Sequence, residues 1–202
     1  TVDASRIRAR GDDVYDLGEV EGVRLPALGH SQSRNALTAI TAAELLAKFG
    51  LQCSHDAMRT GIEGTVLLGR LQYLPEERML VDGGHNDEAL IELGETLKER
   101  FSGGEKVLVC AAMRDKDVHR LAEIAAEQKM SVFATQIDFE RCRTAEEMGD
   151  VFSGKCTVVS DWKEALAQAR ALAEKRGALT VVAGSLYLAG DVLCLLSEEK
   201  GA

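Results

Sequence analysis

Short apolar segments alternate with segments of helical periodicity from Met79 to the end of the chain. In the first pair, the segment MLV precedes a stretch in which Leu90, Leu93 and Leu97 recur at helical spacing. The apolar segments are continuous, which is typical of parallel strands that are buried on both faces. The sequence therefore predicts an α/β fold with a Rossmann-like, mostly parallel sheet and helices on both of its faces. The expected strands are 78–84, 105–113, 130–137, 156–161 and 178–184, and the expected helices are 86–101, 117–128, 144–152, 162–175 and 185–196.

Residues 1–64 show a different pattern, and we expect them to form a separate part of the protein. Residues 1–26 are polar and glycine-bearing, and their short alternating pieces predict a hairpin-like tail without a fold of its own. The segment 33–49 consists mostly of alanine and larger apolar residues, so it predicts a largely buried helix that ends at Gly50. A second helix is expected at about 54–62. Because the first residue is not methionine, we expect the chain to be a piece of a longer protein.

The bulk composition disfavours several kinds of partner. A formal net charge of −9 disfavours nucleic acid and gives no general attraction for nucleoside triphosphates, so a nucleotide site has to be built from local residues. No apolar run approaches the length of a membrane-spanning helix, so we expect no membrane partner. The five cysteines form no CxxC pair, which favours a reduced, cytoplasmic setting. The four histidines lack ligand-like spacing, so no metal site is expected.

Three polar clusters each follow an expected strand. They are DGGHN (82–86), MRDKD (113–117) and GSLY (184–187). The carboxyl ends of parallel strands meet at one edge of a sheet, and ligands of open α/β sheets bind beyond that edge. The sequence therefore predicts that the three clusters lie together and form a ligand site.

Each cluster taken alone is also explained as a loop with a helix cap. Asn86 is a suitable cap for the helix that follows it, Asp115 or Asp117 for the next helix, and Ser185 for the last helix. Both interpretations stay open from these residues, although three clusters at one edge favour a ligand site over three separate caps.

The sequence contains no phosphate-binding loop. There is no GxxxxGK[ST] segment, and no GxGxxG segment follows the first strand of the alternating region. The helix after Asn86 begins with Asp87 and Glu88, whose carboxylates would repel a phosphate at its N-terminus. This sheet is therefore neither a P-loop NTPase nor a self-sufficient dinucleotide-binding domain. Asp82, at a strand end, is free to accept hydrogen bonds from ribose hydroxyls.

Four segments occur in an order that resembles a known family. They are GRLQYL (69–74), MLVDGGHNDEAL (79–90), AAMRDKD (111–117) and VVAGSLYLAGDV (181–192). Together they closely resemble the C-terminal domain of the folylpolyglutamate synthase and dihydrofolate synthase family, which belongs to the Mur ligase superfamily. Upstream, LGHSQSRNALTAI (28–40) resembles the end of that family's central domain.

The resemblance implies a division of the chain and a reaction. Residues 1–64 would be the C-terminal tail of the central ATPase domain, and residues 65–202 the glutamate ligase domain. The reaction implied is ATP-dependent amide formation, in which L-glutamate attacks an acyl phosphate formed on folate or dihydropteroate. ATP and Mg²⁺ would be bound mainly by the missing N-terminal ATPase domain, which carries the P-loop. We therefore expect this chain alone to be inactive as a ligase.

The resemblance also implies roles for particular residues, and none of them is catalytic. The nucleotide-binding residues would be Asn35 near the adenine, Arg70 from the domain linker, Asp82 near the ribose, and His85. The residues on the glutamate side would be His85, Ser185, Lys116 and Asp115. For Lys116, a solvated lysine at the start of a helix is an equal alternative.

The sequence departs from the family pattern beside these positions. Leu67 and Leu68 stand where the family has Trp-Pro, Ser31 replaces a His, Gly84 an Ala, and Asp87 a Pro. Two alternative functions remain open: a stand-alone, non-catalytic binding module, and another Mur-type amino-acid ligase. The GSLYL segment favours the folate branch, within which the sequence leaves dihydrofolate synthase and folylpolyglutamate synthase both open.

Overall fold

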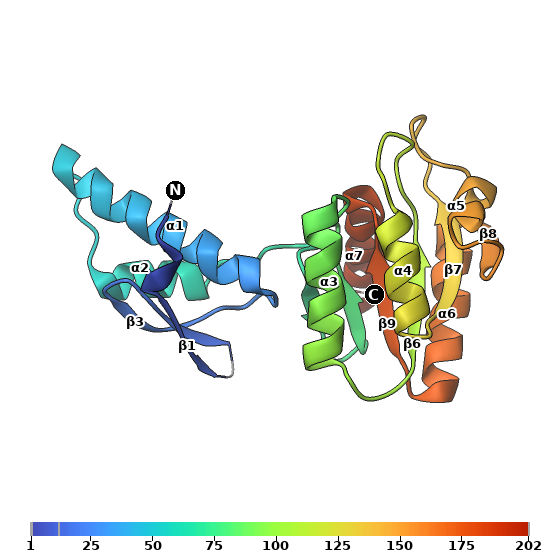
Figure 1. The fold of residues 1–202 in the computed structure, drawn as a ribbon, viewed down its shortest axis with the longest axis horizontal. Coiled ribbons are helices and arrows are strands. Elements are labelled where there is room, and N and C mark those ends of the chain that lie inside the picture. The colour runs from blue at the N-terminus through green and yellow to red at the C-terminus, as the bar shows by residue number, and fades with distance from the viewer. Residues whose placement is uncertain (1, 12, 202) are drawn as a thin grey trace. The chain divides into compact units, whose positions relative to one another are not determined.

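The computed structural model describes residues 2–11 and 13–201, which form two compact units, Thr1–Leu67 and Leu68–Ala202. Each unit has its own sheet and its own hydrophobic core. In the first unit, an antiparallel sheet packs against α1 and α2 (Figure 1). Its elements are η1 (Ala4–Arg6), β1 (Ile7–Gly11), β2 (Val14–Leu17), β3 (Val20–Arg24), α1 (His30–Leu46), η2 (Ala47–Phe49) and α2 (His55–Glu63).

Residues 1–26 contain a three-stranded antiparallel sheet, which confirms the hairpin-like pattern, but this sheet is an integral part of the first unit and not a tail. Gly18, with a φ of +65°, occupies the tight turn between β2 and β3. Apolar side chains of these strands pack with α1 and α2 in one core. That core contains Leu17, Val20, Val23, Leu25, Ala36, Leu37, Ile40 and Met58. The glycines and short alternating pieces thus mark turns within a small sheet.

α1 buries one stripe of its surface, whereas the sequence predicted a largely buried helix. Leu37 and Ile40 are buried, but Leu45 and Leu46 are 50% and 47% exposed. The sheet and α2 contact only the stripe that carries the buried residues, because this unit supplies no second layer for the opposite side of α1 within the described ranges. The prediction from its alanine-rich composition therefore overestimated the buried fraction of this helix.

The second unit confirms the predicted α/β fold with a mostly parallel sheet. Its strand order is β4-β5-β9-β6-β7-β8, with β4 antiparallel to β5 and all other neighbours parallel. The apolar pattern did not indicate β4, whose side chains are partly exposed at the sheet edge. The strands are β4 (Gln72–Leu74), β5 (Met79–Val81), β6 (Lys106–Cys110), β7 (Ser131–Gln136), β8 (Thr157–Asp161) and β9 (Leu179–Ala183).

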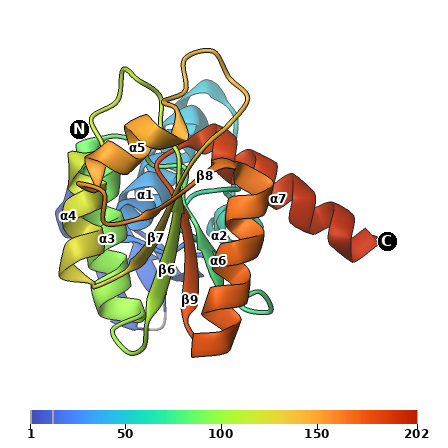
Figure 2. The same ribbon diagram turned by 90° about the vertical axis from the view of Figure 1, so that its right-hand side faces the viewer.

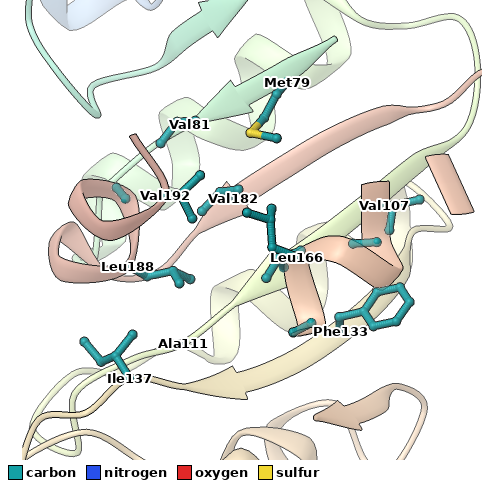
Figure 3. Close-up of a cluster of buried hydrophobic side chains, with 14 of the residues drawn as sticks. Met79, Val81, Val107, Ala111, Phe133, Ile137, Leu166, Val182, Leu188 and Val192 are labelled. Atoms are coloured by element: carbon teal, nitrogen blue, oxygen red, sulfur yellow. The ribbon is translucent and has the colours of Figure 1, made fainter. Parts of the chain in front are cut away.

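Helices cover both faces of this sheet. They are α3 (Asp87–Arg100), α4 (His119–Glu127), α5 (Ala145–Val151), α6 (Trp162–Arg176) and α7 (Leu186–Gly201). Figure 2 shows α3 and α4 on one side of the strands and α6 and α7 on the other. Val81, Val107 and Val182 face Leu166 of α6 and Val192 of α7 in the core (Figure 3). Among the described residues, no helix is long and apolar enough to cross a bilayer.

The position of β9 defines where loops diverge at the carboxyl edge of the sheet. β9 lies between β5 and β6, although it follows them in the chain. The chain leaves β5 and β6 toward α3 and α4 on one face, and leaves β9 toward α7 on the other. In open α/β sheets, ligands usually bind beyond the strand ends at such a divergence.

Candidate functional site

The structure brings the three polar clusters to the carboxyl ends of the adjacent strands β5, β9 and β6. Their backbones approach very closely. A Cβ atom on Gly83 would lie 2.8 Å from the Cα atom of Leu186, and one on Gly184 would lie 2.8 Å from the carbonyl oxygen of Ala111. Gly184 also has a φ of +93°, which favours glycine. Glycine at both positions therefore allows the three loops to meet.

Arg70 lies on a turn that is fastened to the loop after β5. The Gly83 amide donates to the Gly69 carbonyl over 2.7 Å, and the Leu71 amide donates to Oδ1 of Asp82 over 3.2 Å. Gly69 and Leu71 both have positive φ, at 65° and 41°. We call residues 69–71 the Arg70 turn. Its backbone is fixed on both sides of Arg70, while the Arg70 side chain is exposed.

Asp82 is a buried carboxylate with one oxygen left without a hydrogen bond. The residue is 3% exposed, and Oδ2 has no hydrogen-bond partner among the described residues. Burial raises the pKa of Asp82 from its ordinary 3.8 to about 6, although the amides of Leu71 and Gly84 and the charge of Arg70 act to lower it. The Gly84 amide is thus close enough to influence the charge without completing a hydrogen bond to Oδ2. A buried acid that titrates near neutrality at a strand end is typical of a functional site.

His85 presents one ring nitrogen to its own loop and leaves the other for a ligand. Its Nδ1 lies 3.2 Å from the carbonyl oxygen of Gly83. A carbonyl oxygen can only accept, so this contact requires the proton on Nδ1. In the neutral ring, Nε2 is then an acceptor, and the half-buried His85 can accept a hydrogen bond there.

Asn86 and Ser185 act as the helix caps that the sequence allowed. The Ala89 amide donates to Oδ1 of Asn86 over 2.9 Å, and the Leu188 amide donates to Oγ of Ser185 over 3.4 Å. Ser185 is 3% exposed. Its hydroxyl proton is not used in that bond, so capping α7 is compatible with a further role as a donor.

Replacing Asn86 by alanine should lower the free energy of unfolding by about 1 kcal/mol, because the Ala89 amide would lose its cap. Urea unfolding of the variant checks this value. Asn86→Asp, which keeps an acceptor and adds a charge that suits the helix N-terminus, is the matched control and should retain wild-type stability. Equal losses in both variants would contradict the capping role.

Asp115 and Lys116 form an exposed ion pair in the loop after β6. Nζ of Lys116 lies 2.9 Å from Oδ2 of Asp115, and this bond holds the pKa of the Asp115 carboxyl below its usual value. Asp117, rather than Asp115, accepts from the first turn of α4, through the His119 amide over 3.0 Å. Within residues 2–11 and 13–201, no hydrogen bond or ion pair joins Lys116 to Asp82, His85 or Ser185. The loops after β5 and β6 lie on either side of the loop after β9, and no bond among the described residues joins Lys116 to these side chains.

Asn35 lies in the first unit, where it lines a cavity of about 220 Å³. Gln32, one helical turn earlier on α1, lines the same cavity, and its Oε1 is buried without a hydrogen-bond partner in the described part of the chain. The remaining walls are mostly apolar and include Leu25, Ala36 and Ile62. Apolar walls with two amides suit a flat heteroaromatic ring that needs donors and acceptors at its rim. The candidate residues inferred from the sequence did not include Gln32, which its spacing of three from Asn35 could have indicated.

The described residues supply no evident metal site. They contain no group of three or more His, Cys, Asp or Glu side chains that could hold a metal ion. The carboxylates near the edge are engaged otherwise, since Asp115 pairs with Lys116 and Asp82 accepts from Leu71. No Mg²⁺ ligand is therefore assigned to a residue of this chain.

A model of a known protein family matches the part of the chain that carries the site. The family model described as "Mur ligase, glutamate ligase domain" matches residues 69–186. That range begins at the Arg70 turn and ends at Leu186, so it contains DGGHN, MRDKD and all of GSLY except Tyr187. It extends over more than half of the chain.

Individual relatives agree with this match. Dihydrofolate synthase/folylpolyglutamate synthase of Bacillus subtilis is 28% identical over 179 residues, which are 85% of this chain and 40% of that protein. The protein of the same name from Escherichia coli is 28% identical over 187 residues, 91% of this chain and 42% of that protein. The chain thus spans about 40% of the length of these curated relatives.

Solved structures show the same fold. Folylpolyglutamate synthase of Mycobacterium tuberculosis, solved in complex with ADP and AMPPCP, superposes with a TM-score of 0.74 at 25% identity, over 87% of this chain and 42% of that chain. Folylpolyglutamate synthase of Thermotoga maritima superposes with a TM-score of 0.70 at 28% identity, over 88% of this chain and 41% of that chain. The mostly parallel sheet and its helices are therefore shared with these enzymes.

Proposed function

This chain belongs to the Mur ligase family through its glutamate ligase domain, and on that premise we propose that it is part of an ATP-dependent ligase that adds L-glutamate to folate or dihydropteroate. The product bond is an amide, formed through an acyl phosphate. The relatives named for this activity are longer than this chain, so we propose the reaction for the whole protein. The single observation that carries the proposal is the Arg70 turn. It is fastened to Asp82 at the edge that the family match contains, with a cationic side chain exposed.

We assign the nucleotide-side roles as follows. The cavity lined by Gln32 and Asn35 takes the adenine, because its apolar walls accept the flat ring and the two amides satisfy the ring's polar rim. The exposed guanidinium of Arg70 neutralises phosphate charge. Asp82 fixes the Arg70 turn through Leu71 and retains Oδ2 as a free acceptor for a ribose hydroxyl.

The glutamate side is assigned to the loops after β5, β6 and β9. Lys116 exchanges its bond to Asp115 for a carboxylate of the incoming amino acid. Nε2 of His85, an acceptor in the neutral ring, orients the amino group by accepting a hydrogen bond from it. The Ser185 hydroxyl donates to the substrate from the start of α7. These residues bind and orient the substrate, and positioning alone accounts for a large part of the rate in such reactions.

ATP, when bound, supplies the activated phosphoryl group. We propose that Mg²⁺ is bound mainly by the N-terminal ATPase domain that this chain lacks. The 202 residues contain no GxxxxGK[ST] segment that would hold the triphosphate. We therefore expect the chain by itself to lack ligase activity in an assay of glutamate-dependent ADP release. ADP release at the rate of the full-length enzyme would contradict this assignment.

The proposed function is tested in the full-length enzyme with Arg70→Ala. We expect the variant to need at least tenfold more ATP for half-maximal glutamate ligation, because the charge that faces the phosphates is removed. Arg120→Ala is the matched control, since Arg120 is exposed on α4 and pairs with its helix neighbour Glu123. The measurement is ADP release and glutamate incorporation with folate or dihydropteroate as the acceptor.

Two outcomes would reject the proposal. If the wild-type enzyme, supplied with L-glutamate, fails to release ADP with folate and also with dihydropteroate, the substrate class is wrong. If Arg70→Ala and Arg120→Ala have the same dependence on ATP, Arg70 does not contact the nucleotide.

A further inference from the structure

The loop after β6 is paired with the loop after β7. The Arg143 amide donates to the Ala112 carbonyl over 2.8 Å, and the Arg114 amide donates to the Arg141 carbonyl over 2.9 Å. Between them, Met113 and Cys142 form an antiparallel bridge. The loop that carries Lys116 is therefore fixed on one side by a short ladder that continues past the end of the parallel sheet.

The Arg143 side chain reaches across this ladder into the turn that carries Lys116. Its Nη2 donates to the carbonyl of Arg114 over 3.3 Å and to that of Lys116 over 3.0 Å. The Lys116 amide in turn donates to the Met113 carbonyl over 3.1 Å. One guanidinium thus bridges two carbonyl groups of the turn, which a lysine ammonium could not do with the same fixed geometry.

Arg143 makes these bonds at a cost. Its Nε is buried and has no hydrogen-bond partner in the parts of the chain that the structure describes, and its other bonds go to carbonyl groups instead of a carboxylate. A buried donor that stays unpaired is expensive to keep. This unfavourable free energy is consistent with a structural role for the Arg143 side chain in fixing the turn of Lys116.

The backbone of Arg143 is itself held firmly. The next residue, Thr144, caps α5 in a reciprocal capping box with Glu147. The Ala145 amide donates to Oε1 of Gln136, at the end of β7, over 3.0 Å. Arg114 adds a second link, because its guanidinium pairs with Glu147 over 3.2 Å. The guanidinium of Arg143 therefore extends from a rigid base to a turn whose side chains are exposed.

We propose that Arg143 is a positioning residue that sets the turn of Asp115 and Lys116, and thereby the place where Lys116 meets the carboxylate of the amino-acid substrate. The proposal rests on the proposed function, in which Lys116 binds that carboxylate. It adds a residue that contacts no substrate and acts through the carbonyl groups of the loop. We expect its effect on the amino-acid side alone, because no bond among the described residues joins Arg143 to the Arg70 turn.

The test compares Arg143→Ala, Arg143→Lys and Arg141→Ala in the full-length enzyme. Arg141 is the matched control: it lies two residues away and is exposed, and its guanidinium stacks on Phe139 at 5.5 Å. We expect Arg143→Ala to raise the KM for glutamate about tenfold while the KM for ATP stays unchanged, with a smaller rise in Arg143→Lys. Arg141→Ala should leave both values unchanged. Added guanidinium should partly restore the KM of Arg143→Ala.

Hydrogen exchange of the 202-residue chain gives a readout that does not depend on activity. The amides of Arg114 and Lys116 should exchange faster in Arg143→Ala, while amides of β6 remain protected. An unchanged KM for glutamate, or an equal rise in the KM for ATP, would overturn the proposal. If Arg143→Ala does not fold, Arg143→Lys decides by the same criteria. If the wild type does not use glutamate, the proposed function fails, and unchanged exchange at Lys116 would then also reject the role of Arg143.

Discussion

Replacing Gly184 by alanine should lower the free energy of unfolding of the second unit by about 3 kcal/mol, which is large for a single methyl group. Two effects add. The backbone at Gly184 has a φ of +93°, which an L-residue adopts only with strain. The new Cβ would also lie 2.8 Å from the Ala111 carbonyl oxygen. That oxygen is backbone of a fully buried residue directly after β6, so it cannot move aside easily.

Gly190→Ala is the matched control for this prediction. Gly190 lies in α7 and is exposed, and a methyl group added to its Cα would meet no other atom within 4 Å. Alanine there should raise stability by up to about 1 kcal/mol, because it favours the helix. Urea unfolding followed by the fluorescence of Trp162 reports on the second unit, since this is the chain's one tryptophan. Similar effects of the two substitutions would show that the approach of Gly184 to Ala111 is not tight.

Replacing Asp82 by asparagine should stabilise the second unit at pH 7 by up to about 3 kcal/mol and remove a pH dependence between pH 4 and 6. Burial raises the pKa of Asp82 from 3.8 to about 6 in the folded chain. Between these two values the folded state holds a proton that the unfolded state has released. The free energy of unfolding therefore falls as pH rises through this window, and the full penalty applies above pH 6. Asparagine cannot ionise, yet it keeps an acceptor for the Leu71 amide.

The measurement is the difference in unfolding free energy between wild type and Asp82→Asn at several pH values, which cancels the titration of other groups. The difference should be small below pH 4 and reach its limit above pH 6. Asp115→Asn is the control, because Asp115 is exposed and its pKa is lowered by Lys116. A difference for Asp82→Asn that does not change with pH would show that this carboxyl group does not titrate in the window. If asparagine makes the protein more stable than the natural aspartate does, the carboxyl group of Asp82 serves function and not stability.

The sequence was most informative about the second unit, and for a physical reason. Continuous apolar strands and helical spacing are local signals, so they indicated the parallel sheet and the edge where DGGHN, MRDKD and GSLY lie. The sequence did not indicate β4, because an edge strand is partly exposed and therefore needs few apolar residues. The short alternating pieces of residues 1–26 indicated a hairpin-like tail, but they could not show that these strands share one core with α1 and α2.

The contacts that organise the site could not be predicted, because they join residues far apart in sequence. Asp82 is buried, and its partner amide belongs to Leu71, a residue in a conformation that favours glycine. Arg143 lies among charged neighbours, so nothing in its sequence distinguishes it from Arg141. Its role becomes visible only when the loops after β6 and β7 are seen to pair.

The fastening of the Arg70 turn has a mechanical consequence. Arg70 follows the boundary at Leu67 by only three residues, yet its neighbours Leu71 and Gly69 are bonded to Asp82 and Gly83 at the end of β5. Arg70 is thus covalently part of a connecting segment but mechanically part of the six-stranded sheet. A force applied to its guanidinium by a bound anion passes through two hydrogen bonds into β5, and from there into the rigid body of the sheet.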